Sequence, residues 1–133
     1  MKKATTAISV LLLSAFSAFA QGGEQKDIPT MAAEAADYLN KILDLEDWQL
    51  YQVDSTFLHN YEGMTGEVEV LRKKGANNSD LYVQISDKWM DKCDSTFLKI
   101  FSEDQWKRYL KLTTYGKAKR ERDKRNAKKA AKN

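Results

Sequence analysis

One stretch decides the fold: Phe101-Ser102-Glu103-Asp104-Gln105-Trp106-Lys107-Arg108-Tyr109-Leu110. Ser102 can accept a hydrogen bond from the backbone N–H of Gln105, while the Gln105 side chain reaches back to the Ser102 N–H. This reciprocal pair is the capping box of an α-helix. Glu103 and Asp104 add negative charge at the positive end of the helix dipole. The stretch therefore predicts a helix that begins directly after Ser102.

A related segment, Leu45-Glu46-Asp47-Trp48-Gln49, lies upstream. It keeps the glutamine, but Glu46 stands where a hydroxyl would cap the helix. Asp44 together with Asp47 is an alternative cap one turn earlier, because a short carboxylate can accept from the free N–H groups. The sequence predicts a second helix start here and leaves its cap open.

Both segments resemble the Leu-Thr-x-x-Gln motif of the Spy/CpxP family of periplasmic helical chaperones and stress adaptors. The residues that carry the resemblance are Leu45, Gln49, Phe101, Ser102 and Gln105, with Phe for Leu and Ser for Thr in the second copy. Family members carry two such motifs in a small exported helical chain. The resemblance implies ATP-independent holding of partly folded polypeptides on the cradle of a thin antiparallel dimer, or docking on an envelope stress sensor.

The first twenty residues have the three parts of a signal peptide. Lys2 and Lys3 form a basic start, residues 7–16 form a short apolar run, and Ala18-Phe19-Ala20 is a small-residue cleavage site. The run is too short to span a membrane, and the residue directly after the cleavage site is Gln21, not a cysteine that could carry a lipid. We therefore expect an exported protein in the periplasm, with secretion beyond it as the alternative.

Apolar residues recur at helical spacing along most of the remaining chain. We expect a disordered linker over 21–29, one all-helical domain over 30–115 and a basic, partly helical tail over 116–133. The first helix should run from about Met31 to Leu43. Its apolar stripe consists of Met31, Ala35, Tyr38, Leu39 and Ile42.

Two longer stripes follow, separated by the turn sequence Gly75-Ala76-Asn77-Asn78, so two long helices should form an antiparallel hairpin. Gly63 and Gly66 predict a kink or a weakened turn in the first of them. An alternation of apolar and polar residues over 66–86 leaves a β-hairpin as the alternative. The stripes are Leu50, Val53, Phe57, Tyr61, Met64, Val68 and Leu71, and then Tyr82, Ile85, Trp89, Cys93, Phe97 and Ile100.

The predicted fold class is therefore all-α. We expect a small antiparallel helical hairpin or bundle of about four helices, forming a thin homodimer, with a basic C-terminal helical extension. Dimerisation is expected because one short domain buries only a small core.

Aromatic residues are numerous, with three Trp and six Tyr. Most of them should lie in the core, but any that line a concave face would form an amphipathic surface for unfolded chains. The candidates for contact with such clients are Trp48, Trp89, Trp106 and Tyr109.

Charge is divided unequally along the chain. Residues 107–133 hold twelve basic and two acidic residues, a net +10, whereas residues 21–106 hold eight basic and seventeen acidic, a net −9. The tail is either a solubilising segment or an arm that binds an anionic lipid surface or nucleic acid without sequence specificity. The candidate anion-binding residues are Lys117, Lys119, Arg120, Arg122, Lys124 and Arg125.

Residues with the chemistry of catalysis or metal binding are few. Cys93 and His59 are each the only one of their kind and lie 34 positions apart, so neither a metal site nor a Cys-His nucleophile is predicted. Cys93 should be a buried thiol, with an intermolecular disulfide as the alternative. Asp54 and Asp94 could pair, but both lie beside core positions. We expect no enzyme activity, no cofactor and no metal, and an exported, ATP-independent chaperone-like protein.

Overall fold

The structure, a computed structural model, describes residues 26–132. Five α-helices make up this part of the chain, and it contains no strand. The prediction of an all-α fold is confirmed, and the alternative β-hairpin over 66–86 is wrong. The predicted signal peptide and most of the predicted linker lie outside the described residues. The helices are α2 (Ile28–Leu43), α3 (Asp47–Lys73), α4 (Ser79–Ile100), α5 (Glu103–Leu112) and α6 (Thr114–Lys132).

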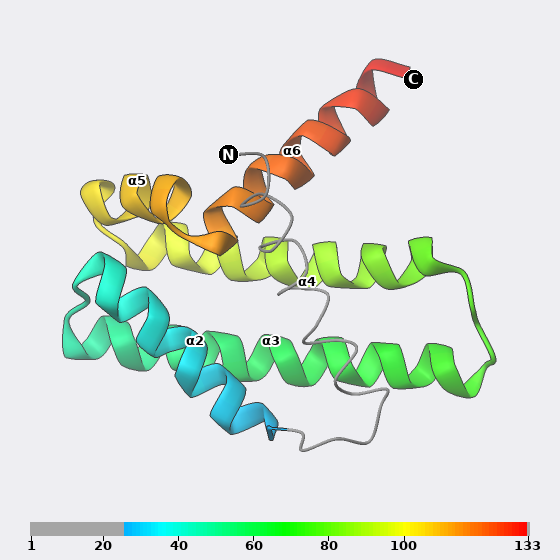
Figure 1. The fold of residues 1–133 in the computed structure, drawn as a ribbon, viewed down its shortest axis with the longest axis horizontal. Helices are drawn as coiled ribbons and strands as arrows, with labels where there is room; N and C mark the ends of the chain where they lie inside the picture. Colours follow the sequence, from blue (N-terminus) through cyan, green and yellow to red (C-terminus); the bar gives the residue numbers. More distant parts are fainter. Residues whose placement is uncertain (1–25, 133) are drawn as a thin grey trace, which may run out of the picture.

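Helices α3 and α4 lie side by side and antiparallel, joined by a short turn at one end (Figure 1). In that turn Gly75 has a φ of 71°, which glycine adopts without strain. Asn78 caps α4, and its side chain accepts from the Asp80 N–H at 2.9 Å. The predicted antiparallel hairpin and its turn are therefore present.

The core lies at the other end of the hairpin, where α2 packs on α3 and α5 joins the end of α4. Aromatic rings dominate it. Phe57 and Phe97 meet edge to face with centroids 5.2 Å apart, and Phe97 meets Tyr109 at 5.7 Å. The largest fully buried side chains are those of Tyr109, Phe57, Phe97, Leu39, Leu43, Val53 and Cys93.

The ends of α2 differ from the prediction. The helix begins at Ile28, three residues before Met31, because the Asp27 side chain accepts from the Thr30 N–H at 2.9 Å and proline is favourable in a first turn. Asp44 does not cap α3 as proposed. It ends α2 in the left-handed conformation, with φ 53°, and Glu46 is the N-cap residue of α3.

Helix α3 continues as one helix through Gly63 and Gly66, so the two glycines at which a kink or a weakened turn was predicted do not interrupt it. A Cβ atom at Gly63 would lie 2.2 Å from the Trp89 ring, whereas one at Gly66 would meet nothing within 4 Å. Gly63 therefore serves to let the indole of α4 pack against the backbone of α3.

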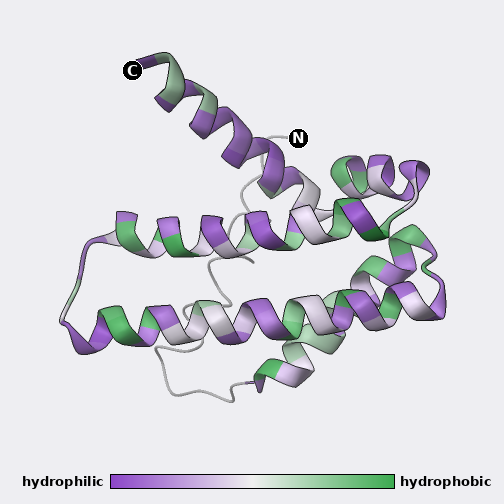
Figure 2. Ribbon diagram, turned by 180° about the vertical axis from the view of Figure 1, so that it is seen from behind, coloured by the Kyte–Doolittle hydropathy of each residue, from purple (hydrophilic) through white to green (hydrophobic). Residues whose placement is uncertain are grey.

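The predicted solvated tail is instead partly docked. Helix α6 begins at Thr114, and Gly116 and Arg122 are buried. A Cβ at Gly116 would lie 2.1 Å from the Tyr109 carbonyl oxygen, so only glycine allows this close crossing of α5 and α6. The later part of α6 projects away from the other helices (Figure 1) and is mostly hydrophilic (Figure 2). None of the five described helices is long and apolar enough to cross a membrane.

Candidate functional site

The two Gln motifs form the helix starts that the sequence predicts. Ser102 Oγ accepts from the Gln105 N–H at 3.2 Å, and Gln105 Oε1 accepts from the Ser102 N–H at 2.9 Å. In the first motif Gln49 Oε1 accepts from the Glu46 N–H at 2.9 Å. Each glutamine therefore holds the N-terminus of its own helix.

The structure also brings these two glutamines together, which the sequence did not predict. Gln49 Nε2 donates to Gln105 Oε1 at 2.7 Å, and Gln105 Nε2 donates to Gln49 Oε1 at 3.1 Å. Gln49 Nε2 also lies 3.1 Å from the carbonyl oxygen of Ile100. Both side chains are buried, where unpaired amides would be costly. We call this pair the glutamine joint, and it ties the start of α3 to the start of α5.

The surroundings of the glutamine joint close the end of the core. Leu45 and Phe101, the apolar residues of the two motifs, are both buried. Arg108 donates to the carbonyl oxygens of Ile42 and Leu43, at 3.1 and 3.2 Å. These carbonyls belong to the last turn of α2 and have no partner within their own helix. The five residues that carry the family resemblance thus lie in one region. The contacts that they make there cap helices and join them to one another.

The four predicted client-contact residues have different environments. Trp48 is 54% exposed, and its indole donates to the Glu46 carboxylate at 2.5 Å. Trp89 and Trp106 are half-buried, with Trp106 stacked on Tyr109 at 5.2 Å. Tyr109 is fully buried, so the prediction that it contacts clients is wrong. Its hydroxyl is needed inside the fold.

A further exposed aromatic side chain, not predicted from the sequence to contact clients, lies one turn after Trp48. Tyr51 is 70% exposed, and the spacing of three residues puts it beside Trp48 on α3. We call these two residues the α3 aromatic pair. Its signal in the sequence was weak, because Tyr51 lies outside the regular apolar stripe of α3.

Asp94, Tyr109 and Arg122 form a buried network that holds α6 against α4. The Tyr109 hydroxyl and the Arg122 guanidinium both donate to the Asp94 carboxylate. Arg122 also donates to Asp91 at 2.9 Å. Burial raises the pKa of Asp94, although the bonds from Tyr109 and Arg122 oppose this. The pKa of Tyr109 is raised as well, by burial and by the neighbouring Asp94 charge.

This network changes the interpretation of the predicted anion-binding residues. Arg122 is only 4% exposed and is committed to Asp94, so it cannot meet an external anion. Arg125 pairs with Asp87 at 2.8 Å, and Lys119 pairs with Asp123 at 2.7 Å. The remaining candidates, Lys117, Arg120 and Lys124, make no ion pair within residues 26–132. The usable signal in the sequence was the row Asp87, Asp91 and Asp94, whose spacing of four and three puts them on one side of α4.

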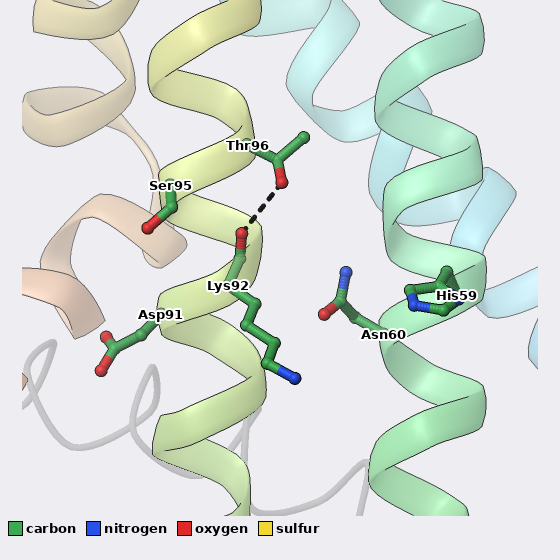
Figure 3. Close-up of a pocket in the computed structure, with 6 residues that line it drawn as sticks. All are labelled: His59, Asn60, Asp91, Lys92, Ser95 and Thr96. Atoms are coloured by element: carbon green, nitrogen blue, oxygen red, sulfur yellow. Dashed lines mark hydrogen bonds between the residues drawn. The ribbon is translucent and has the colours of Figure 1, made fainter.

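A shallow, open depression of about 470 Å³ lies where α3 and α4 face each other (Figure 3). Asn60 is its most buried side chain, and its Nδ2 donates to the Thr56 carbonyl oxygen at 2.7 Å. Its Oδ1 has no partner within the described chain. The depression is lined by His59, Asn60, Asp91, Lys92, Ser95 and Thr96. Such a set offers hydrogen-bond donors and acceptors to a bound group.

Cys93 and His59, the two residues considered for nucleophile or metal chemistry, lie in different environments. Cys93 is fully buried, and burial raises its pKa to about 12. Such a thiol is a poor nucleophile, because the thiolate is the reactive form. His59 packs edge to face on Trp89 with ring centroids 6.2 Å apart. Within the described residues no group of three or more His, Cys, Asp or Glu side chains could hold a metal ion.

A comparison with known proteins found no matching family model, no matching curated protein and no matching solved structure. Function is therefore inferred from the motifs and the geometry of this chain alone.

Proposed function

We propose that this is an exported, chaperone-like protein that holds unfolded or partly folded polypeptides without ATP. The observation that carries the proposal is the glutamine joint. The two segments that resemble the Spy/CpxP motif are 56 residues apart, yet Gln49 and Gln105 pair directly. The two motifs thus act as one structural unit, which supports reading them together as a family feature.

The α3 aromatic pair is the surface that we propose for clients. Trp48 and Tyr51 present large apolar rings with polar edges, which can contact varied side chains at low entropic cost. Acidic residues of the surrounding helix would speed encounter with basic client segments. Further exposed apolar side chains occur along α3, α4 and α5, at Val70, Leu81, Val83, Leu98 and Leu112.

The test is suppression of aggregation. The purified protein, residues 21–133, is added without nucleotide to a chemically unfolded model client, and light scattering is followed over time. We expect suppression at stoichiometric amounts. The variant Trp48→Ala/Tyr51→Ala should need at least roughly tenfold more protein, because losing two anchor side chains costs about 1 kcal/mol or more each.

The matched control is Gln52→Ala/Ser55→Ala, which truncates two exposed side chains in the next turn of α3. It should suppress aggregation as the parent protein does. A second variant, ending at Asn126, keeps the ion pairs of Arg122 and Arg125 and removes only the end of α6. If the parent protein fails to suppress scattering of several unrelated clients, the holding function is refuted, and docking on one envelope stress sensor becomes the better hypothesis.

Homodimerisation is part of the proposal, because a second copy would extend the exposed apolar surface of a thin body. Sedimentation velocity at several protein concentrations tests it directly. A species of monomer mass at all concentrations would restrict client contact to the surface of one chain.

A further inference from the structure

Helix α6 divides its basic residues between two sides. Arg122 and Arg125 point to α4, where they pair with Asp94, Asp91 and Asp87. The other side carries a row with spacings of three, four, four and four residues, which places its members along one face of a helix. We call it the α6 basic row: Lys117, Arg120, Lys124, Lys128 and Lys132.

The docking of Arg122 fixes the direction of this row. Arg120 and Lys124 each lie two residues from Arg122, which corresponds to about 200° around an α-helix. Because Arg122 is buried against Asp94, these two side chains must face away from α4. Both are exposed.

The α6 basic row is long, straight and nearly uncompensated. From Lys117 to Lys132 it extends over about 22 Å at 1.5 Å per residue. None of its five members forms an ion pair within residues 26–132. Glu121 lies on the same face, four residues after Lys117 and three before Lys124, and it is the one acidic neighbour there, since Asp123 pairs with Lys119. The end of α6 projects beyond the other described helices (Figure 1), and four members of the row, Arg120, Lys124, Lys128 and Lys132, are exposed.

The residue types favour one kind of partner. Two arginines of α6, whose planar fork suits bidentate recognition of a phosphate or a base edge, already have partners within the fold: Arg122 is buried against Asp94, and Arg125 pairs with Asp87 at the surface. Four of the five row members are lysines, which act as point charges in a diffuse field. Tyr115, the aromatic residue of α6, packs inward, with its ring centroid 5.1 Å from that of Phe57, so it cannot stack on a base. We propose that the α6 basic row docks on the surface of a bilayer that contains anionic lipids.

Binding of this kind would be peripheral and electrostatic. The row has no large apolar side chain to insert between lipids, and each cation near the surface contributes about 1 kcal/mol, or roughly fivefold in partitioning. The interaction should fall steeply with salt, because the field is screened within about 10 Å at 0.1 M. This proposal does not depend on the holding function, and either can fail alone.

The test is co-sedimentation of residues 21–133 with vesicles of neutral phosphatidylcholine, with or without about one third anionic phosphatidylglycerol. We expect binding only to the anionic vesicles, and its loss between about 0.05 and about 0.5 M salt. The variant Arg120→Gln/Lys124→Gln/Lys128→Gln/Lys132→Gln should partition several-hundred-fold more weakly, since four cations contribute about fivefold each.

The matched control removes the same number of positive charges from the other helices and the turn between α3 and α4. It is Lys73→Gln/Lys74→Gln/Lys99→Gln/Lys111→Gln, and all four positions are exposed. It should keep most of the vesicle binding. Equal losses in both variants would mean that net charge alone acts, and would overturn the proposal. Tighter binding to single-stranded DNA than to anionic vesicles at equal salt would also overturn it, in favour of nucleic acid. Circular dichroism of both variants checks that α6 stays helical.

Discussion

Replacing Arg122 by Met tests whether the Asp94 network holds α6 in place. In the parent protein, Arg122 and Tyr109 both donate to the Asp94 carboxylate, and Asp94 is only 3% exposed. Methionine preserves most of the side-chain volume but removes the guanidinium. The carboxylate is then left buried with one neutral donor, and removing one partner of a buried pair costs about 3–5 kcal/mol.

This loss is large for so small a domain, whose total stability should be about 5–15 kcal/mol. A loss of about 1 kcal/mol lowers the melting temperature of such a domain by about 4–8 °C. We therefore expect Arg122→Met to melt at least roughly 12 °C below the parent protein. Thermal unfolding followed by far-UV circular dichroism measures this difference.

The effect should also depend on pH, with a definite sign. Burial already raises the pKa of Asp94 above the usual range of an aspartate, and removing the Arg122 charge raises it further. A carboxyl group whose pKa is higher in the folded state stabilises the fold at low pH and loses that contribution as pH rises through the folded pKa. The deficit of Arg122→Met should therefore be smaller at about pH 5 than at about pH 8.

A second variant separates loss of charge pairing from loss of packing. Asp94→Asn/Arg122→Met keeps an acceptor for the Tyr109 hydroxyl and removes both charges, so it should recover most of the stability and show no such pH dependence. If Arg122→Met unfolds within about 1 kcal/mol of the parent protein at both pH values, the pair acts like an exposed surface pair. The buried docking of α6 would then be refuted.

Three further predictions concern single residues of the body. Gly63→Ala should lower the free energy of unfolding in urea by about 1–3 kcal/mol, because its Cβ would overlap the Trp89 ring. Gly66→Ala has open space around it and should instead stabilise α3 by up to about 1 kcal/mol. Equal effects of the two substitutions would contradict the tight packing at Gly63. Gln105→Ala should cost about 2 kcal/mol or more, since it removes a capping box and half of the glutamine joint together; a loss below about 0.5 kcal/mol would show that the joint contributes little. Cys93, with its pKa raised to about 12, should react with a thiol reagent only after unfolding, and rapid reaction of the native protein would show that it is accessible.

Local patterns of the sequence were sufficient for the helices. The capping box of Ser102 and Gln105 depends on residues three positions apart, so it can be identified without knowing what lies around it. Over 66–86 the alternation of apolar and polar residues also allowed a β-hairpin. The helical spacing of apolar residues continues on both sides of that segment, and it correctly favoured the helices α3 and α4. Gly75 and Asn78 marked the turn between them for the same local reason.

Pairings between distant segments could be decided only by the tertiary structure. Gln49 and Gln105 each cap a helix by themselves, and nothing in either motif specifies that the two side chains should meet. Gly63 suggested a kink by its propensity, but its role is set by the Trp89 ring on another helix. In both cases the partner is chosen by packing, which sequence periodicity does not contain.

The docking of α6 shows the same limit most clearly. From the sequence, Arg122 was one of several basic residues in a polar segment without an apolar stripe, and Asp94 was one of seventeen acidic residues in the preceding part of the chain. Their selection depends on the close crossing at Gly116, which directs α6 toward the acidic row of α4. The sequence determined by itself that this protein is helical and where α5 begins, because those choices depend on neighbours within one or two turns. Which charges are buried and which remain free for a partner was decided only when the helices packed, because burial and pairing depend on distances across the whole fold.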